Sequence, residues 1–522
     1  MNYIFKGGHI LGHPDNTAVL VSGDRIKHIG RYSDCLLMSI DHVETIDLTN
    51  KALLPAFTDA HTHFLEYAKS RIYVNLTDCK DIEGIKSYLT SYRDKLDWNP
   101  QWILGGGWNR NVLEDHMALN KHILDSIFPD VPVALFSKDY HSKLCNSKAL
   151  AAAGIDRHTT DPDGGRIERD NSGEPTGVLY ETAAELLDRF IVPAPEDIIL
   201  RAVYDTIQHM YQWGLIGFHT MENQASRDIL HSAQSIGKLF RFCWHFQTTD
   251  LSSVIDSGIR SYEGDEWYKL CGYKLFADGS LGSRTAAMFQ GYASEPENKG
   301  ILRYSDEELY KAIEHAAQHG FSSTIHAIGD RAVYQVIEAV KRLNSIPEYR
   351  SLKHRIEHVQ SIRHLDLNAL KSSGLLASMQ PVHLANDIPM IEEHWKDIPD
   401  EAYPFASLIQ AGIPYAFGSD TPIETMNPFL GIYTALERKE ALCPDADAWI
   451  PEERISVAAA ILGYTQGAAM ASCSQDSQGS ITKGKVADLI ILEDYRTLPN
   501  EYWLEASSLF TMIGGQVVHS GL

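Results

Sequence analysis

The stretch Leu53-Leu-Pro-Ala-Phe-Thr-Asp-Ala-His-Thr-His63 decides how this chain is interpreted. An apolar, strand-like run ends in two histidines, His61 and His63, that are separated by one residue. In an extended strand, residues i and i+2 point to the same side, so both imidazoles can bind one metal ion at the strand's carboxyl end. In a chain with 23 histidines the pair alone is weak evidence, and it gains weight only from further ligands downstream.

From residue 53 onward, strand-like segments alternate with helix-like ones, which is typical of parallel β/α units. Ser305 and Glu308 form a capping box at the start of one such helix, and Gly320 ends it. The predicted strands cover residues 53–63, 214–222, 239–246, 271–278, 322–328, 355–360, 375–380 and 415–420. Eight strands predict an α/β fold of the (β/α)₈ TIM-like barrel type. An open doubly wound sheet is the alternative, but no Gly-x-Gly-x-x-Gly turn supports it.

Short strands bounded by turn residues occupy both ends of the chain. Pairing them would protect their edges, so we expect residues 1–52 and 480–522 to form one small β-sandwich domain. The metal-dependent barrel domain would then span residues 53–479. About 150 residues separate His63 from the second strand, far more than a normal connection, which predicts an inserted subdomain at about 70–195, over the site.

The bulk composition points to a folded, acidic enzyme. With 46 basic and 69 acidic residues, the formal charge is −23, which disfavours nucleic acid and anionic membrane surfaces as partners. The seven cysteines are scattered without a Cys-x-x-Cys motif, as expected in a reducing compartment. Neither a signal pattern nor a membrane-length apolar run is present, so we expect a cytoplasmic protein that acts on a small molecule.

The later strands supply candidate metal ligands. Lys274 lies within an apolar run, where an unpaired ammonium is costly, and carbamylation would turn its amine into a carboxylate able to bridge two metals; Asp278 is an alternative carboxylate. His326 and His358 end the fifth and sixth strands, where barrel active sites lie, although a lone histidine there is more often structural. Asp420 ends the eighth strand and could instead be a helix cap.

These residue types together indicate hydrolysis. Imidazoles and carboxylates without thiolates suit Zn²⁺, with Mn²⁺ or Fe²⁺ as substitutes. Zinc lowers the pKa of bound water to about 7, which provides a hydroxide nucleophile and polarises the carbonyl that it attacks. An aspartate such as Asp420 can bind the metal and accept the proton of that water.

The motifs give the chain a resemblance to the amidohydrolase superfamily, and within it to the YtcJ-like branch that includes N-substituted formamide deformylase. They are 59-Asp-Ala-His-Thr-His-63, 274-Lys-Leu-Phe-Ala-Asp-Gly-Ser-280, 326-His-Ala-Ile-Gly-Asp-Arg-331, 357-Glu-His-Val-Gln-360 and 418-Gly-Ser-Asp-Thr-Pro-422. The resemblance covers essentially the whole chain. It implies a binuclear site with two Zn²⁺ ions, bridged by carbamylated Lys274, with Asp420 as the catalytic proton shuttle. The implied metal ligands are His61, His63, Lys274, His326, His358 and Asp420.

The resemblance also narrows the reaction. Deaminases of this superfamily carry a glutamate three residues after the strand-five histidine, and here that position is Gly329, which disfavours deamination. We therefore expect hydrolysis of a non-peptide carbon–nitrogen bond in an amide, an N-substituted formamide or a cyclic amide, by attack of metal-bound hydroxide. Loop positions over the mouth suggest the following substrate contacts: Trp108, Asn109, His141, Arg284 and Gln380.

Two other functions compete with this one. The branch includes regulators of exoenzyme production, so a non-catalytic regulatory or ligand-binding protein is one alternative. The retention of Lys274 and Asp420 argues against it. A metal-dependent lactonase or esterase is the other, because the same metals and ligands serve ester hydrolysis. A homodimer is an expectation from the superfamily alone.

Overall fold

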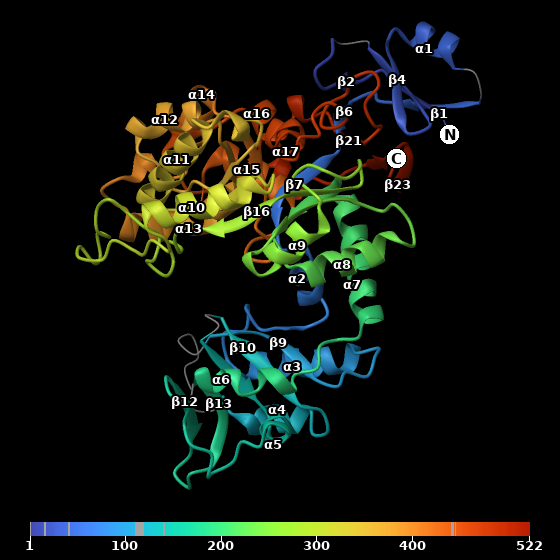
Figure 1. Ribbon diagram of the computed structural model, residues 1–522. Coiled ribbons are helices and arrows are strands. Elements are labelled where there is room, and N and C mark those ends of the chain that lie inside the picture. The colour runs from blue at the N-terminus through green and yellow to red at the C-terminus, as the bar shows by residue number, and fades with distance from the viewer. Residues whose placement is uncertain are drawn as a thin grey trace. The chain divides into compact units, whose positions relative to one another are not determined.

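The computed structural model describes residues 2–14, 17–39, 42–109, 119–138, 141–439, 443 and 445–522. The chain separates into two compact units. The first joins Met1–Phe64 to Thr206–Leu522, and the second is Leu65–Asp205. The first unit contains a barrel and a sandwich, both of which are drawn with their element labels in Figure 1.

The largest sheet has eight parallel strands and confirms the predicted TIM-like barrel. Its strands, in spatial order, are β7 (Phe57–Thr62), β14 (Leu215–Thr220), β15 (Arg241–Phe246), β16 (Tyr268–Phe276), β17 (Ser323–Ala327), β18 (Arg355–His358), β19 (Leu376–Met379) and β20 (Tyr415–Phe417). Thr62 and Thr421 form a parallel bridge between the first and last strand segments. Most residues of these strands are buried on both faces, as expected for a sheet enclosed by helices.

Helices follow the barrel strands along the chain. They include α8 (Gln224–Gln234), α9 (Leu251–Ser257), α10 (Asp306–Gln318), α11 (Asp330–Asn344), α12 (Leu367–Ser373), α13 (Pro381–His394), α14 (Phe405–Gln410) and α15 (Pro428–Glu437). The predicted capping box of α10 is present: the Ser305 hydroxyl accepts from the Glu308 amide, and the Glu308 carboxylate accepts from the Ser305 amide. The capping box therefore marks the start of α10 where the sequence predicts it.

The run at residues 53–63, which the sequence predicts to be one strand, is two strands in different sheets. Strand β6 (Lys51–Pro55) pairs antiparallel with β21 (Leu489–Glu493) in the sandwich, and β7 then enters the barrel. The chain crosses at Ala56, whose amide donates to the Asp488 carbonyl. The apolar pattern conceals this break because both strands are buried.

The sandwich is built from both ends of the chain. One sheet has the order β4-β3-β1-β5 and the other β2-β6-β21-β22-β23. The added strands are β1 (Asn2–Lys6), β2 (His9–Ile10), β3 (Ala18–Ser22), β4 (Arg25–Gly30), β5 (Val43–Asp47), β22 (Phe510–Ile513) and β23 (Gln516–Ser520). Figure 1 shows the blue and red ends of the chain meeting here, and their shared core includes Phe5, Val19, Leu489 and Phe510.

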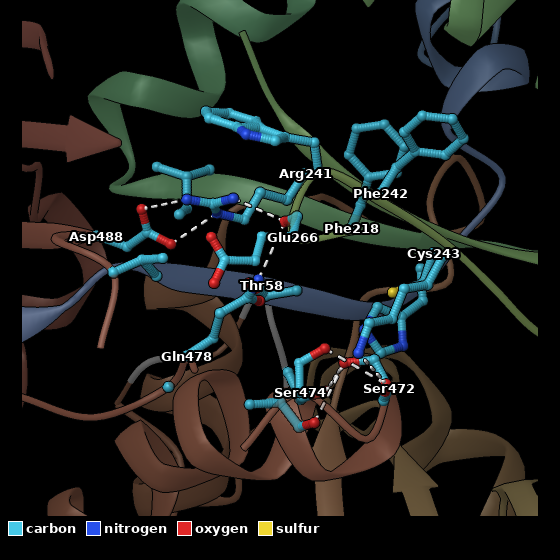
Figure 2. A pocket seen from close by; sticks show the side chains of 18 of the residues that line it. Thr58, Phe218, Arg241, Phe242, Cys243, Glu266, Ser472, Ser474, Gln478 and Asp488 are labelled. Carbon is cyan, nitrogen blue, oxygen red and sulfur yellow. Dashed lines mark hydrogen bonds and ion pairs between the residues drawn. The ribbon is translucent and has the colours of Figure 1, made fainter. Parts of the chain in front are cut away.

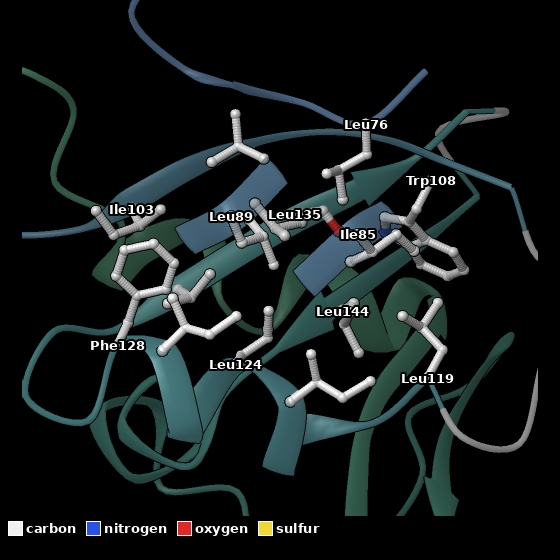
Figure 3. Packing of buried hydrophobic residues seen from close by; sticks show 14 of the residues in the cluster. Leu76, Ile85, Leu89, Ile103, Trp108, Leu119, Leu124, Phe128, Leu135 and Leu144 are labelled. Atoms are coloured by element: carbon white, nitrogen blue, oxygen red, sulfur yellow. Dashed lines mark hydrogen bonds between the residues drawn. The ribbon is translucent and has the colours of Figure 1, made fainter. Parts of the chain in front are cut away.

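The second unit contains its own sheet, in the order β12-β13-β11-β10-β9-β8. Its elements are β8 (Val74–Asn75), α3 (Ile82–Lys95), β9 (Ile103–Trp108), α4 (Lys121–Ile127), β10 (Val133–Ser137), β11 (Ser142–Cys145), α5 (Ser147–Ala153), β12 (Gly165–Arg169) and β13 (Pro175–Glu181). Figure 3 shows Leu89, Trp108, Leu124 and Leu135 packed in its core. Among the described residues of the whole chain, no helix combines the length and hydropathy needed to cross a membrane.

Candidate metal centre

Three predicted ligands come together at the carboxyl end of the barrel, although they are far apart in sequence. His61, His358 and Asp420 each offer a ligand atom, and these atoms lie within 4.8 Å of one another. They come from the ends of β7 and β18 and from the segment after β20. Neutral imidazole nitrogen and carboxylate oxygen suit a divalent metal such as zinc.

His63 and His326 border this group. The His63 Nε2 atom lies 3.4 Å from Asp420 Oδ1, and His61 Nε2 lies 3.3 Å from the same oxygen. The His326 ring centroid is 4.6 Å from that of His358. Five of the six predicted ligands are thus linked by short side-chain distances.

Unusual backbone conformations turn two of these residues toward the group. His358 has φ +76° and Asp420 has φ +60°, in the left-handed region that non-glycine residues rarely adopt. The Asp420 amide donates to the His61 carbonyl over 2.7 Å, which fixes the end of the eighth strand to the first. Strained conformations of this kind cluster at functional sites.

Hydrogen bonds to Nδ1 decide which ring nitrogen of His61 and His358 faces the group. His61 Nδ1 lies 2.5 Å from Glu357 Oε2, and His358 Nδ1 lies 2.9 Å from Gln380 Oε1. Because both partners accept hydrogen bonds, each Nδ1 can donate its proton to them, and each Nε2 would then be available as a ligand atom. Gln380 is buried and also donates to the Ser378 carbonyl, and its contact with a substrate stays a prediction.

A buried ion pair supports Glu357. Arg355 Nη2 donates to Glu357 Oε2 over 3.0 Å, and its Nε atom donates to Oε1. The same guanidinium donates to the Ala60 carbonyl and to the Ser378 hydroxyl, and Nη1 lies 2.9 Å from His219 Nδ1. Burial would raise the pKa of Glu357, but Arg355 and His61 hold that pKa well below its usual range. Glu357 is therefore a charged acceptor for His61.

The pKa values of Lys274, Asp420 and His326 are shifted by burial and by neighbouring side chains. Burial lowers the pKa of Lys274 to about 8, against the opposing effect of Glu357 and Asp420. Burial would raise the pKa of Asp420, but His61 and His63 hold that pKa well below its usual range. Burial also lowers the pKa of His326 to about 3, with Lys274 adding to the effect. The result is an ionised carboxylate beside a neutral imidazole, the forms that bind metals.

Asp278, the alternative carboxylate, lies beside His326, whose Nε2 atom is 3.5 Å from Asp278 Oδ1, and backbone amides hold its oxygens. Its oxygens accept hydrogen bonds from the backbone amides of Ala287, Ile328 and Gly329, at 2.9 to 3.0 Å. Burial raises its pKa to about 7, while these amides act in the opposite direction. These contacts join the segment after β16 to the segment after β17, which carries His326. Asp278 therefore acts as a connector of loops.

Gly329 occupies the position where deaminases of the superfamily carry glutamate, and the structure leaves no room there for a side chain. A Cβ atom built on Gly329 would lie 2.1 Å from the Ala287 carbonyl oxygen. Backbone cannot move aside as a flexible side chain can. This position therefore cannot supply a proton donor.

We expect Gly329→Ala to lower the free energy of unfolding by about 1–3 kcal/mol, the usual cost of overpacking. Urea unfolding monitored by circular dichroism measures the change. Gly237→Ala is the matched control, because its Cβ would meet only the Leu239 side chain, at ordinary distances of 3.7 and 3.9 Å. Equal stability of the two variants would contradict the steric exclusion at Gly329.

The other predicted substrate contacts have varied surroundings. Trp108 is 1% exposed, and its indole N–H donates to the Leu135 carbonyl, so it is a core residue of the second unit. Asn109 and His141 belong to the same unit, where His141 is exposed and lies 3.2 Å from Glu181. Arg284 pairs with Glu295 over 2.9 Å in the segment after β16. Substrate contact by Asn109, His141 and Arg284 stays a prediction.

Three residues near the centre were not predicted from the sequence. Glu357 and Asp59 lie inside the quoted motifs, and Asp59 Oδ1 accepts from the amides of His61 and Ser419, both over 3.0 Å. His383, in the first turn of α13, has its Nε2 atom 3.8 Å from Asp420 Oδ2. A search of each strand's carboxyl end and the helix turn that follows would have found His383.

A barrel whose mouth gathers histidines, a buried lysine and an ionised aspartate defines the class of metal-dependent hydrolases. Comparison with known proteins agrees with this class. The chain belongs to the amidohydrolase family, whose family model matches residues 44–519. It is a hydrolase, as the sequence predicted.

Individual relatives cover nearly the whole chain. YtcJ of Bacillus subtilis (strain 168) is 31% identical over 99% of both chains. The N-substituted formamide deformylase of Arthrobacter pascens is 26% identical over 91% of this chain and 90% of its own. A crystal structure of an uncharacterized metal-dependent hydrolase from Pyrococcus horikoshii OT3 has the same fold, with a TM-score of 0.78 and 24% identity over 99% of this chain and 100% of its own.

Proposed function

We propose that this protein is a zinc-dependent hydrolase of a non-peptide carbon–nitrogen bond, in an amide, an N-substituted formamide or a cyclic amide. The observation that carries the proposal is the approach of His61, His358 and Asp420 to within 4.8 Å at the barrel mouth. The relative that acts on N-substituted formamides supports this substrate class.

The donor set fits a divalent metal. His61, His63, His326, His358, Lys274 and Asp420 would hold two ions, with Lys274 bridging as a carbamate. Glu357 and Gln380 accept hydrogen bonds from Nδ1 of His61 and His358, so Nε2 of each histidine would be the atom that binds a metal. Bound zinc would polarise a substrate carbonyl and lower the pKa of a water molecule to about 7.

Asp420 is the residue that we propose moves the proton. Its carboxylate is ionised at neutral pH, because His61 and His63 hold its pKa low. It can therefore accept the proton of the attacking water and deliver it to the leaving nitrogen, which must be protonated to depart. His383, whose Nε2 atom lies 3.8 Å from Asp420 Oδ2, would lie close to the same leaving group.

A substrate panel tests the bond type. Matched N-substituted formamides, cyclic amides, lactones and peptides are incubated with the zinc-loaded protein, and kcat/KM is measured for each. We expect the formamides and cyclic amides to be hydrolysed faster than the lactones, and the peptides to be left intact. Faster hydrolysis of lactones would overturn the assignment to carbon–nitrogen bonds and favour an ester hydrolase.

Lys274 provides an independent prediction. An amine whose pKa is about 8 is partly neutral at pH 8, and only the neutral amine reacts with carbon dioxide to form a carbamate. We expect the protein with zinc and ¹³C-bicarbonate to give a carbamate carbon resonance by NMR, and Lys274→Ala to lose it. Lys143, which is also buried, is the matched control, and Lys143→Ala should retain the resonance. A resonance that survives Lys274→Ala would contradict the carbamate.

A further inference from the structure

A cavity lies at the amino-terminal end of the barrel, the end opposite the metal centre. Its lining includes Thr58, Arg241 and Tyr268, which lie at or near the starts of barrel strands, and the C-terminal residues Ser472 and Asp488. Figure 2 shows Arg241 and Asp488 bridged on one wall, where Nε and Oδ2 are 2.7 Å apart. The sulfur of Cys243 lies on another part of the wall.

Cys243 has a second thiol beside it. It lies in β15, and Cys271 lies in the neighbouring strand β16. The register of the two strands shifts at this point: Trp244 pairs with Leu270, and His245 pairs with Gly272, which leaves Cys271 as an extra residue. The bulge therefore sets Cys271 beside the segment of β15 that carries Cys243. Cys243 is partly exposed and Cys271 is buried.

Basic groups surround the pair. His219 of β14 and Lys269 of β16 are the strand partners of Cys243 on its two sides. His219 Nδ1 faces Arg355 Nη1, an obligate donor, so its Nε2 atom carries the proton that it can donate to sulfur. A thiolate at Cys243 is therefore supported by a hydrogen-bond donor and by nearby cations.

The other partly exposed cysteines have surroundings that differ from those of Cys243. The Cys271 thiol, with help from His219 and Lys269, lowers the pKa of Cys243 well below its usual value. Burial raises the pKa of Cys79, and the neighbouring Asp78 and Asp81 add to the effect. Burial also raises the pKa of Cys473. Cys79 is thus a matched comparison, because it is partly exposed but carries the opposite electrostatics.

We propose that Cys243 and Cys271 form a peroxide-oxidised thiol pair at the cavity beneath the barrel, with Cys243 as the attacking residue and Cys271 as the resolving residue. The Cys243 thiolate attacks a small hydroperoxide; an S–O bond forms, the O–O bond breaks, and water or an alcohol leaves. The Cys271 sulfur then attacks the sulfenic acid; an S–S bond forms, and the oxygen leaves as a second water. Two thiols are oxidised, and one hydroperoxide is reduced.

The strand geometry places the two cysteines on adjacent strands. These strands lie about 4.7–4.9 Å apart, Cys243 is paired with Lys269, and the bulge at Cys271 must bring its Cα atom within the 4.4–6.8 Å that disulfides span. Access is provided by the cavity, which the exposed face of Cys243 lines. The pair is separate from the metal ligands, so its oxidation does not depend on the proposed hydrolysis.

Peptide mapping by mass spectrometry tests the proposal on the full-length protein. The reduced protein is treated with hydrogen peroxide at a molar ratio near one, the remaining thiols are alkylated with iodoacetamide, and disulfide-linked peptides are identified. We expect a Cys243–Cys271 link that a thiol reductant reverses, while Cys79 and the exposed Cys443 remain alkylated. Loss of the Cys443 or Cys79 thiols ahead of Cys243, or the absence of the link, would overturn the proposal.

Two variants separate the two roles. In Cys271→Ser, the sulfenic acid should persist at Cys243 and react with dimedone. In Cys243→Ser, Cys271 should stay a free thiol, because it lacks both access and activation. Dimedone labelling at Cys79 in either variant, without labelling at Cys243 in Cys271→Ser, would contradict the assignment. Iodoacetamide alone should modify Cys243 in wild type faster than Cys79, since a lower pKa gives a larger thiolate fraction.

Discussion

Replacing Asp420 by asparagine is expected to lower kcat by about 10²–10⁴-fold, the usual contribution of a positioned acid–base group. Asparagine keeps the shape of the side chain and one oxygen, but it cannot accept a proton at neutral pH. The carboxylate that it replaces is ionised, because His61 and His63 hold its pKa well below the usual range. The chain should still fold, since the Asp420 backbone amide continues to donate to the His61 carbonyl.

The measurement is the rate of hydrolysis of the best substrate of the panel, with metal content determined on the same samples. Asp366→Asn is the matched control. Asp366 is also a buried aspartate; its Oδ2 atom lies 2.6 Å from Arg363 Nε, and it is not one of the proposed metal ligands. We expect that control to retain wild-type kcat. An Asp420→Asn protein with metal bound and unchanged turnover would show that another group moves the proton.

Glu357→Gln is expected to lower the free energy of unfolding by about 3–5 kcal/mol, the usual cost of removing one partner of a buried ion pair. Glu357 is completely buried between Arg355 and His61. Glutamine carries no charge and has only one acceptor oxygen, so either the guanidinium or the imidazole then faces an N–H group. Zinc affinity should also fall by about 10–100-fold, because His61 loses the charged acceptor that orients it.

Chemical unfolding of the metal-free protein and a competition titration of zinc measure the two effects separately. A double variant, Arg355→Met with Glu357→Met, removes both charges together. We expect it to be more stable than Glu357→Gln, because no unpaired charge is left in the barrel, but to bind zinc no better, because His61 Nδ1 still lacks its acceptor. A Glu357→Gln protein with wild-type stability and zinc affinity would contradict the role of Glu357.

The barrel could be predicted from the sequence because its signals are local. Each buried parallel strand is an apolar run of its own, and the helices between strands carry caps such as Ser305 and Glu308. His61, His326, His358 and Asp420 could be predicted as a group because barrel topology brings the carboxyl ends of strands to one mouth. The prediction therefore depended on topology and on residue type, without any knowledge of side-chain partners.

The failures share one physical cause, which is that partners distant in sequence leave no local pattern. The strand break at Ala56 depends on pairing of β6 with β21, more than 400 residues away. Trp108 was predicted to contact the substrate, but it completes the core of the second unit, and the contact of the Gln380 amide with His358 was not predicted. Glu357 stood in a quoted motif, yet only the fold reveals that it contacts His61.

The number of zinc ions per chain, measured by mass spectrometry on protein purified without chelator and in the presence of bicarbonate, tests the proposed metal centre most directly. Two histidines held through Nδ1 so that Nε2 can bind a metal, an ionised aspartate and a buried lysine predict close to two equivalents. The Glu357→Gln protein should retain fewer at the same free zinc concentration. Wild-type protein that binds no divalent metal would contradict the metal centre and, with it, the proposed hydrolysis.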